Sequence, residues 1–154
     1  MTDQQLTELT LRDVPVISQD EPLRTALQRV LDRNLPALPV AGADGKYVGI
    51  FGEREFLQAI FPGYVGQLRG ASFLKHAIDD VLERRVGCAA EPVSKHMLTD
   101  HVSVGEEVSD VQVAEIFLHH PVLIVPVLTG EKAVKGVIVR HDFFRYLAER
   151  LLAS

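Results

Sequence analysis

The residues best suited to binding a small polar ligand are charged groups at the start of two helical segments. Arg140, His141 and Asp142 follow an apolar run, and Arg54 and Glu55 occupy the equivalent place earlier in the chain. A carboxylate accepts hydrogen bonds from hydroxyl groups, arginine binds anions at any working pH, and histidine does so only when protonated. Free N–H groups at a helix N-terminus also favour anions. The alternative is structural: Asp142 complements its helix dipole, Glu55 is a solvated helix residue, and both arginines are surface charges.

The other reactive residues form no familiar catalytic or metal-binding motif. The sequence has no GxSxG, no glycine-rich phosphate loop followed by Lys-Ser/Thr, and no HExxH. His119 and His120 are adjacent, so on a helix they point apart, and we interpret them as a helix end. Cys88 is the only cysteine and cannot form an internal disulfide. We therefore expect no catalytic residue, no metal site and no required cofactor.

Composition narrows the classes of partner. The chain has 154 residues and a net charge of -5, which disfavours nonspecific binding to nucleic acid or to anionic membrane. Tryptophan is absent, so stacking platforms for single-stranded nucleic acid are scarce. Residues 1–10 are polar, and the longest apolar stretch, residues 121–128, is too short to span a bilayer. The sequence predicts a cytoplasmic protein with neither nucleic-acid nor membrane partners.

The chain contains an internal repeat. Shifting the sequence by 87 residues aligns two halves without a gap, and the apolar pattern agrees better than the identities do. The identities include Leu11 with Leu98, Asp13 with Asp100, Leu31 with Leu118, Pro39-Val40 with Pro126-Val127, Gly49 with Gly136, and Phe56 with Phe143. The repeat indicates that the chain is built from two similar units.

Each half predicts the same order of elements: strand, helix, strand, turn, strand, helix. In the first half these are residues 14–17, a helix opened by 20–22, residues 35–40, a turn at 44–45, residues 47–51 and residues 53–60. In the second half they are residues 101–104, 107–119, 122–127, a turn at 129–130, residues 134–139 and residues 141–152. Between the halves, residues 72–85 predict an amphipathic helix.

These elements predict a mixed α/β (α+β) protein made of two pseudo-symmetric units. Each unit should hold a small, mostly three-stranded sheet and two helices. A half of about 55 residues buries too little apolar surface to be comfortable alone, so we expect the halves to pack sheet to sheet. The predicted boundaries are residues 9–61 for the first unit, 62–96 for the linker and 97–152 for the second unit.

The two halves resemble the cystathionine β-synthase (CBS) domain. The resemblance rests on residues 38–40, the turn at 44–45 and residues 47–51, and it recurs at residues 125–127 and 135–142. It covers most of the chain and implies a tandem pair, or Bateman module. Such pairs commonly form homodimers and bind AMP, ADP, ATP or an adenosyl compound such as S-adenosylmethionine in the cleft between the domains.

The resemblance also implies roles for particular residues. In this family a stretch of glycine, two apolar residues, Ser/Thr, two variable residues and aspartate lines the ligand, and the aspartate binds the ribose diol. Asp142 matches the aspartate, whereas Val139 replaces the hydroxyl residue and leaves Arg140 and His141 as candidate phosphate contacts. The first half has Gly52 and Glu55 at these positions, so we expect its site to be weaker. Segments containing Val102, Ser103 and Ile124, together with 14–15 and 36–38, would form the adenine slot.

Two functions remain open from the sequence. The first is a non-catalytic sensor that binds an adenine nucleotide and regulates a partner protein of unknown identity. The second is a structural dimerisation module without a ligand, favoured by the missing hydroxyl at both sites. The helix predicted at 107–119 is apolar on more than one side, which is typical of a protein contact.

Overall fold

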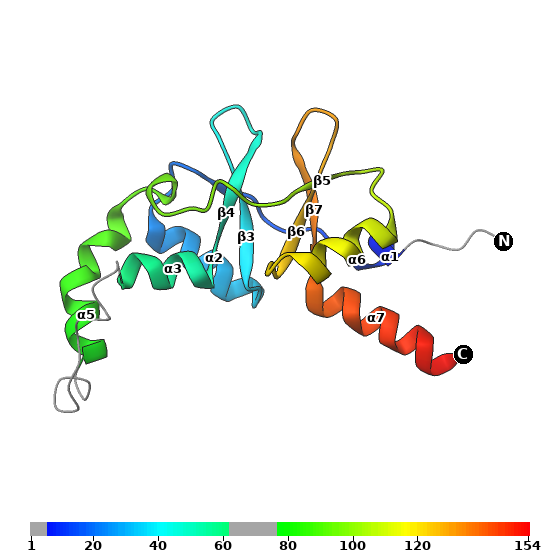
Figure 1. Cartoon of the computed structure of the whole chain (residues 1–154). Coiled ribbons are helices and arrows are strands. Elements are labelled where there is room, and N and C mark those ends of the chain that lie inside the picture. Colours follow the sequence, from blue (N-terminus) through cyan, green and yellow to red (C-terminus); the bar gives the residue numbers. More distant parts are fainter. Residues whose placement is uncertain (1–5, 62–76) are drawn as a thin grey trace.

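The computed structural model describes residues 6–61 and 77–154, and these residues form two similar halves (Figure 1). The first half contains the elements that were predicted, with small shifts at their ends. They are β2 (Ile17–Ser18), α2 (Leu23–Arg33), β3 (Ala37–Ala41), β4 (Tyr47–Gly52) and α3 (Glu53–Ile60). The β3–β4 turn contains Gly45 at φ 80°, a left-handed conformation that glycine adopts without strain.

The second half repeats the strand bounds and the first residue of each helix at the same 87-residue shift, whereas α7 is longer than α3 at its C-terminal end. Its elements are β5 (Val104–Gly105), α6 (Asp110–His119), β6 (Ile124–Leu128), β7 (Val134–Val139) and α7 (Arg140–Ala153). Even the irregularity in the hairpin recurs, between Val40 and Ala41 and between Val127 and Leu128. The turn predicted at residues 129–130 lies in the connection between β6 and β7, and the left-handed residue of this connection is Lys132, at φ 67°. The repeat is therefore a duplication of backbone geometry.

Each half completes its sheet with a segment that belongs to the other half. The strand β1 (Leu11–Arg12) lies at the start of the first half but pairs with β7, giving a sheet of order β1-β7-β6-β5. Leu98, at the start of the second half, exchanges two backbone hydrogen bonds with Ile50, at 2.9 and 3.0 Å, beside the sheet β2-β3-β4. The three-stranded sheets expected from the sequence thus each gain a crossing segment, and this exchange ties the halves together.

The two sheets pack against each other and share one core. The hairpins β3–β4 and β6–β7 stand side by side with their turns at the same edge, and the helices lie on the outer flanks and below (Figure 1). The larger buried cluster is centred on the first half and includes Ile124, Val137 and Val139 from the second. This confirms the expected sheet-to-sheet packing, because neither half could bury these residues alone.

The N-terminal helix docks on the second half. In α1 (Leu6–Thr10), Leu6 is buried with Val113, Ile138 and Phe143. The Asp110 carboxylate accepts hydrogen bonds from the backbone N–H groups of Leu6 and Thr7, at 2.8 and 2.9 Å. Unpaired N–H groups at the start of a helix are stabilised by such a carboxylate. The N-terminal helix therefore packs on the second half, although the first half follows it in the sequence.

The connection between the halves is attached to the first half. It includes α5 (Ala77–Arg85) and two short 3-10 turns, η2 (Val86–Ala90) and η3 (Val93–Lys95). The Arg85 guanidinium donates to the carbonyl of Ala59, and the Leu23 N–H donates to the carbonyl of Glu91. The helix predicted over 72–85 is observed from Ala77, and its earlier part lies outside the described residues. In the described ranges, no helix is long and apolar enough to cross a membrane.

Candidate functional site

Two pockets lie between the halves at positions related by the repeat. Pocket 1, of about 570 Å³, lies where α7 leaves β7, and pocket 2, of about 420 Å³, lies where α3 leaves β4. Pro36 and Leu123, one from each half and related by the 87-residue shift, line both pockets. Both volumes lie within the range of small-molecule sites. The duplication therefore produces a pair of related crevices.

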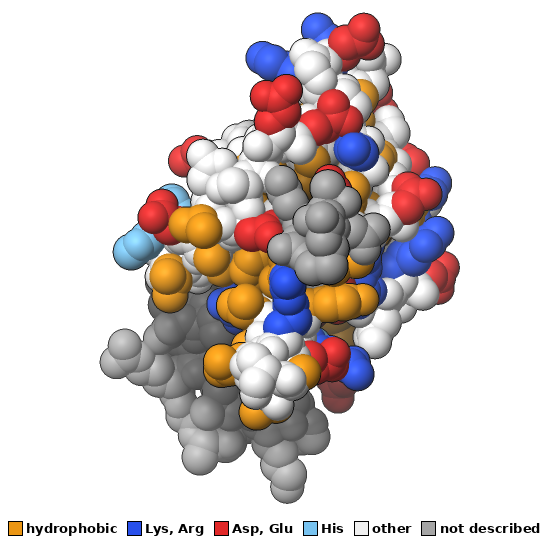
Figure 2. All heavy atoms as spheres, turned by 90° about the vertical axis from the view of Figure 1, so that its right-hand side faces the viewer, with side chains coloured by type: hydrophobic (Ala, Val, Ile, Leu, Met, Phe, Trp, Pro, Cys, Tyr) orange, Lys and Arg blue, Asp and Glu red, His pale blue; other side chains and the backbone are white. Residues whose placement is uncertain are grey.

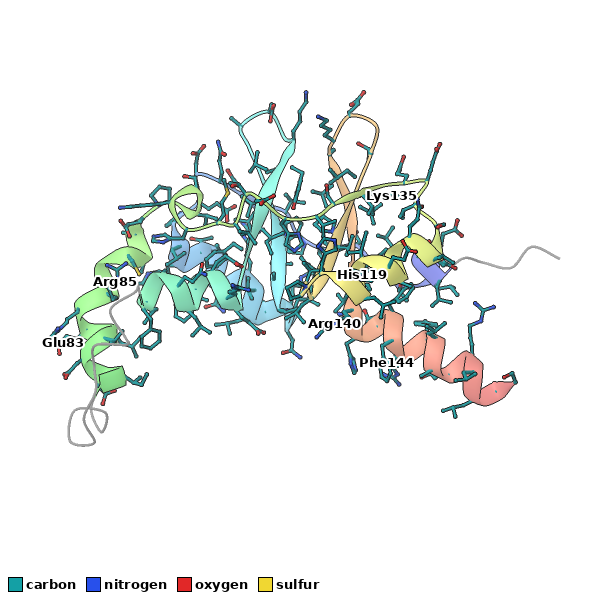
Figure 3. All side chains as sticks on the ribbon, in the orientation of Figure 1. Glu83, Arg85, His119, Lys135, Arg140 and Phe144 are labelled. Carbon is teal, nitrogen blue, oxygen red and sulfur yellow. The ribbon has the colours of Figure 1, made fainter. Side chains whose placement is uncertain are left out.

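Pocket 1 contains mostly basic groups. Arg140 and His141 occupy the first turn of α7, and Arg12 reaches the pocket from β1. Figure 3 shows Arg140 at the start of α7, with Phe144 further along the same helix. Phe144 and Leu123 supply apolar surface. Cationic side chains beside the N-terminus of a helix favour an anionic ligand.

The Asp142 carboxylate in pocket 1 already has a partner. Arg12 Nε lies 2.5 Å from Asp142 Oδ2, and Arg12 Nη2 lies 2.8 Å from Oδ1. This is a bidentate fork, in which each carboxylate oxygen accepts one N–H. The hydrogen bond that Arg12 donates to Asp142 raises the pKa of the Arg12 guanidinium still further, so the guanidinium stays charged. A ligand that uses Asp142 must therefore compete with Arg12.

Pocket 2 is lined by more acidic side chains and more apolar surface. Glu53, Arg54 and Asp100 lie on its wall together with Glu55. His101 also lines it, with Nδ1 2.8 Å from the carbonyl oxygen of Val102. Burial lowers the pKa of the His101 imidazole, which favours its neutral form. The charges of pocket 2 therefore suit a neutral or cationic group better than a phosphate.

Glu55 is buried, so the interpretation of it as a solvated helix residue was wrong. Its side chain is only 3% exposed, and its carboxylate accepts hydrogen bonds from the backbone N–H groups of Gly52 and of Glu55 itself. A glutamate at the third helical position reaches back to the residue that begins the helix, as in one half of a capping box. Burial raises the pKa of Glu55, against the opposing effect of these hydrogen bonds. The Glu55 carboxylate of pocket 2 is thus already hydrogen-bonded to the backbone at the start of its own helix.

We expect Glu55→Gln to alter the pH dependence of stability. A folded-state pKa above the unfolded value means that Glu55 favours the folded state at low pH, and that this contribution is lost as pH rises through the folded pKa. The unfolding free energy of Glu55→Gln should therefore increase relative to wild type from pH 4 to pH 8. Urea unfolding across this range measures the difference.

The control for this experiment is Glu53→Gln, which removes a carboxylate from the exposed surface of the same turn. A constant difference between Glu55→Gln and wild type across the pH range would contradict the expected burial of an ionisable Glu55.

The structure divides the predicted site residues between the two pockets. In pocket 1 lie Val139, Arg140, His141 and Asp142, and in pocket 2 lie Arg54, Glu55, Val102 and Ile124. Ser103 lines neither pocket, and neither do Val14 and Pro15, which were expected near the adenine slot. Leu38 is fully buried in the core instead of facing a ligand. The sequence distinguished the Asp142 site from the Glu55 site, but it did not indicate to which of them Val102 and Ile124 belong.

Sequence reasoning missed Arg12. Its aligned position in the other half is Thr99, so the repeat gave no signal for a basic residue there. Arg12 enters the site only because β1 pairs with β7 of the other half, with Arg12 opposite Val137. Asp100 and His101 of pocket 2 were also missed, although they adjoin the predicted Val102. The adjacency to Val102 was the available signal for these two residues.

A model of the CBS domain family matches this chain at residues 6–62 and 93–149. Among curated proteins, MJ1404 of Methanocaldococcus jannaschii is 24% identical over 153 residues, which cover 97% of this chain and 33% of that protein. The chain therefore spans about one third of the length of this relative.

Solved structures with the same fold extend this likeness. CBSX2 in complex with AMP is 13% identical, with a TM-score of 0.69 and coverage of 95% of this chain and 98% of that one. MJ1225 of Methanocaldococcus jannaschii is 21% identical, with a TM-score of 0.73 over 96% of this chain and 51% of that one. AcuB of Vibrio cholerae is 19% identical, with a TM-score of 0.70 over 97% and 93%. At these identities the likeness shows the fold alone.

Proposed function

This chain belongs to the CBS domain family, and from that premise we propose that it is a non-catalytic regulatory module that binds an adenine nucleotide between its two halves. AMP, ADP and ATP are the candidate ligands for pocket 1. An adenosyl compound without phosphate, such as S-adenosylmethionine, is better suited to the charges of pocket 2. The CBS pair CBSX2 was solved in complex with AMP, which supports the choice of ligand class.

The observation that carries this proposal is pocket 1 itself. Its basic residues Arg140 and His141 lie in the first turn of α7, beside apolar surface from Leu123 and Phe144. A nucleotide presents an anionic end and an apolar ring, and this pocket offers groups that match each. Arg140 has no ion pair among the described residues, so its charge is available to a phosphate.

Isothermal calorimetry of the whole chain with AMP, ADP, ATP and S-adenosylmethionine tests the proposal. We expect at least one of the phosphate ligands to bind with a Kd below about 1 mM, which corresponds to roughly 4 kcal/mol of binding free energy. Arg140→Gln should weaken that binding about tenfold, because a hydrogen bond to a charged group contributes about 1.5–3 kcal/mol.

The matched control is Arg150→Gln, which removes an arginine from the last turn of the same helix, outside both pockets. Its affinity should equal that of wild type. No binding of any of the four ligands at millimolar concentration would defeat the proposed function.

Regulation would follow from the position of the ligand. A molecule bound between the halves contacts both of them, so it favours whichever relative packing gives it better contacts. The protein that responds is not specified by these residues. Since the chain matches only a third of MJ1404, a larger polypeptide could carry the responding part in proteins of that kind. The cytoplasmic location expected from the sequence stays a prediction.

A second candidate function is homodimerisation through an exposed apolar face of α7. Leu147 and Leu151 are exposed four residues apart, and together with Phe144 they line a groove of about 500 Å³ along the helix. Phe143 on the same helix is buried, whereas Phe144, Leu147 and Leu151 are exposed. Figure 2 shows hydrophobic side chains exposed on this end of the molecule among charged ones. A second copy of the chain would bury them.

We expect the double variant Leu147→Glu, Leu151→Glu to weaken a dimer at least tenfold, since burying each leucine contributes roughly 1.5–3 kcal/mol. Sedimentation velocity over a range of concentrations measures the change. The control is Val86→Glu, which places the same charge on an exposed aliphatic residue in η2, on the opposite flank. A wild-type chain that stays monomeric at high micromolar concentration would rule out this dimer.

A further inference from the structure

We propose that Arg12 makes pocket 1 selective for phosphorylated nucleosides. When a nucleotide binds, the Arg12 guanidinium would leave the Asp142 carboxylate and form an ion pair with the phosphate of the ligand. This inference rests on the proposed function and names the residue that decides its ligand class. Arg12 is a residue of the exchanged strand β1, so the selectivity would arise from the crossing of the two halves.

The geometry places the three participants in one cavity. Arg12, Asp142 and the cationic Arg140 all line pocket 1. Pairing of β1 with β7 fixes the backbone of Arg12 opposite Val137, just before β7 passes into α7. The Arg12 side chain is 46% exposed and that of Asp142 is 19% exposed. The Arg12 side chain therefore lines the pocket while it stays partly open to solvent.

An exchange of partners follows from the chemistry of these groups. Both Asp142 oxygens accept an N–H from Arg12, so a ribose diol must displace at least part of the fork before it can bind there. A nucleoside without phosphate would leave Arg12 without an anionic partner. A nucleotide brings phosphate oxygens, which match the arginine fork as well as a carboxylate does. The exchange then costs little free energy, because the Arg12 guanidinium replaces its ion pair with Asp142 by an ion pair with the phosphate.

Pocket 2 lacks this arrangement, so the two crevices differ despite their common origin. The position equivalent to Arg12 is Thr99, and Thr99 is absent from the lining of pocket 2. The acid equivalent to Asp142 is Glu55, which is bound to backbone N–H groups of its own helix. Selection by exchange of an arginine is therefore confined to pocket 1.

Calorimetry with AMP and adenosine on the whole chain tests this inference. Wild type should bind AMP more tightly than adenosine. In Arg12→Gln, adenosine should bind about fivefold more tightly, because an exposed ion pair no longer competes. AMP should bind roughly tenfold more weakly, because a charge-assisted contact to phosphate is lost. The preference for AMP over adenosine should therefore fall by about fiftyfold.

The matched control is Arg29→Gln. Arg29 makes a two-nitrogen contact with Glu21 at 3.1 Å, with side-chain exposures of 42% and 21%, and it lies outside both pockets. Its loss should leave the AMP preference unchanged. A second variant, Arg12→Lys, keeps the positive charge without the fork and should give an intermediate preference, so the test does not depend on one variant folding.

The outcomes separate this inference from the proposed function. If wild type binds AMP, and both Arg12→Gln and Arg12→Lys prefer AMP over adenosine as strongly as wild type does, Arg12 has no part in selection. The proposed function then still stands. If neither ligand binds to wild type or to either variant, this inference fails, and calorimetry with ADP, ATP and S-adenosylmethionine then decides whether the proposed function fails too. A fall in preference in Arg29→Gln equal to that in Arg12→Gln would also overturn the assignment.

Discussion

Gly52→Ala is expected to destabilise the protein by about 3 kcal/mol, at the upper end of the usual cost of overpacking. A Cβ at this position would lie 2.1 Å from the carbonyl oxygen of Pro36 and 2.5 Å from both Cα and Cβ of Ala37. These are backbone and short side-chain atoms that cannot move aside alone. The Pro36 carbonyl also accepts a hydrogen bond from the Glu53 N–H at 2.9 Å, which joins the start of α3 to the strand beside it. The alanine would push these elements apart.

Urea unfolding measures this effect, and Gly105→Ala is its control. Gly105 lies in β5, and a Cβ there meets no atom within 4 Å. We expect the control to change the unfolding free energy by less than about 1 kcal/mol. Equal stability of the two variants would mean that the start of β3 and the end of β4 approach each other less closely than the structure describes.

Gly52 also explains why the first half departs from the family pattern at the hydroxyl position. A serine or threonine there would meet the same Pro36 carbonyl as an alanine. Gly52→Ser should therefore destabilise the fold without adding a phosphate contact to pocket 2. The equivalent Val139 is buried and lines pocket 1, so a side chain is accommodated in the second half. The loss of the hydroxyl thus has a steric cause in one half only.

Leu6→Ala is expected to destabilise the protein by about 2–4 kcal/mol, as is usual for removing a buried leucine side chain. Leu6 is 2% exposed and packs in the cluster of the second half with Val113, Val127, Ile138 and Phe143. Although it precedes the first half in the sequence, its loss should loosen the second half. Urea unfolding gives the magnitude, and amide hydrogen exchange should show faster exchange concentrated in β6 and β7.

The control for this prediction is Leu9→Ala on the same short helix. Leu9 is 39% exposed, so its truncation should cost less than about 1 kcal/mol. If both variants were equally stable, or if exchange increased only in the first half, α1 would not be part of the core of the second half.

The exchange of segments makes the two halves one cooperative unit. Leu11 and Arg12 complete the sheet of the second half, and Leu98 adds to that of the first. Both crossings require a glycine. A Cβ at Gly49 would lie 2.3 Å from the Leu98 carbonyl oxygen, and a Cβ at Gly136 would lie 2.5 Å from the Arg12 carbonyl oxygen. A ligand between the halves would therefore act on a single folding unit.

The sequence by itself determined the repeat and its elements. Apolar periodicity marks strands and helices locally, so β3, β4, β6, β7 and the four main helices were placed within a few residues. The aligned Pro-Val pairs and glycines then predicted the family, and the acid at the start of each second helix predicted where a site would lie. These properties depend on neighbours along the chain, and a sequence records such neighbours directly.

Only the tertiary structure decided which groups meet. Arg12 binds Asp142 across 130 residues, and Asp110 caps a helix more than 100 residues away. The burial of Glu55 and the division of the predicted residues between two pockets also depend on how the halves cross. Each of these contacts joins segments whose separation in the chain says nothing of their distance in space. The sequence contains both Asp142 and Arg12, but only the pairing of β1 with β7 shows that they form an ion pair.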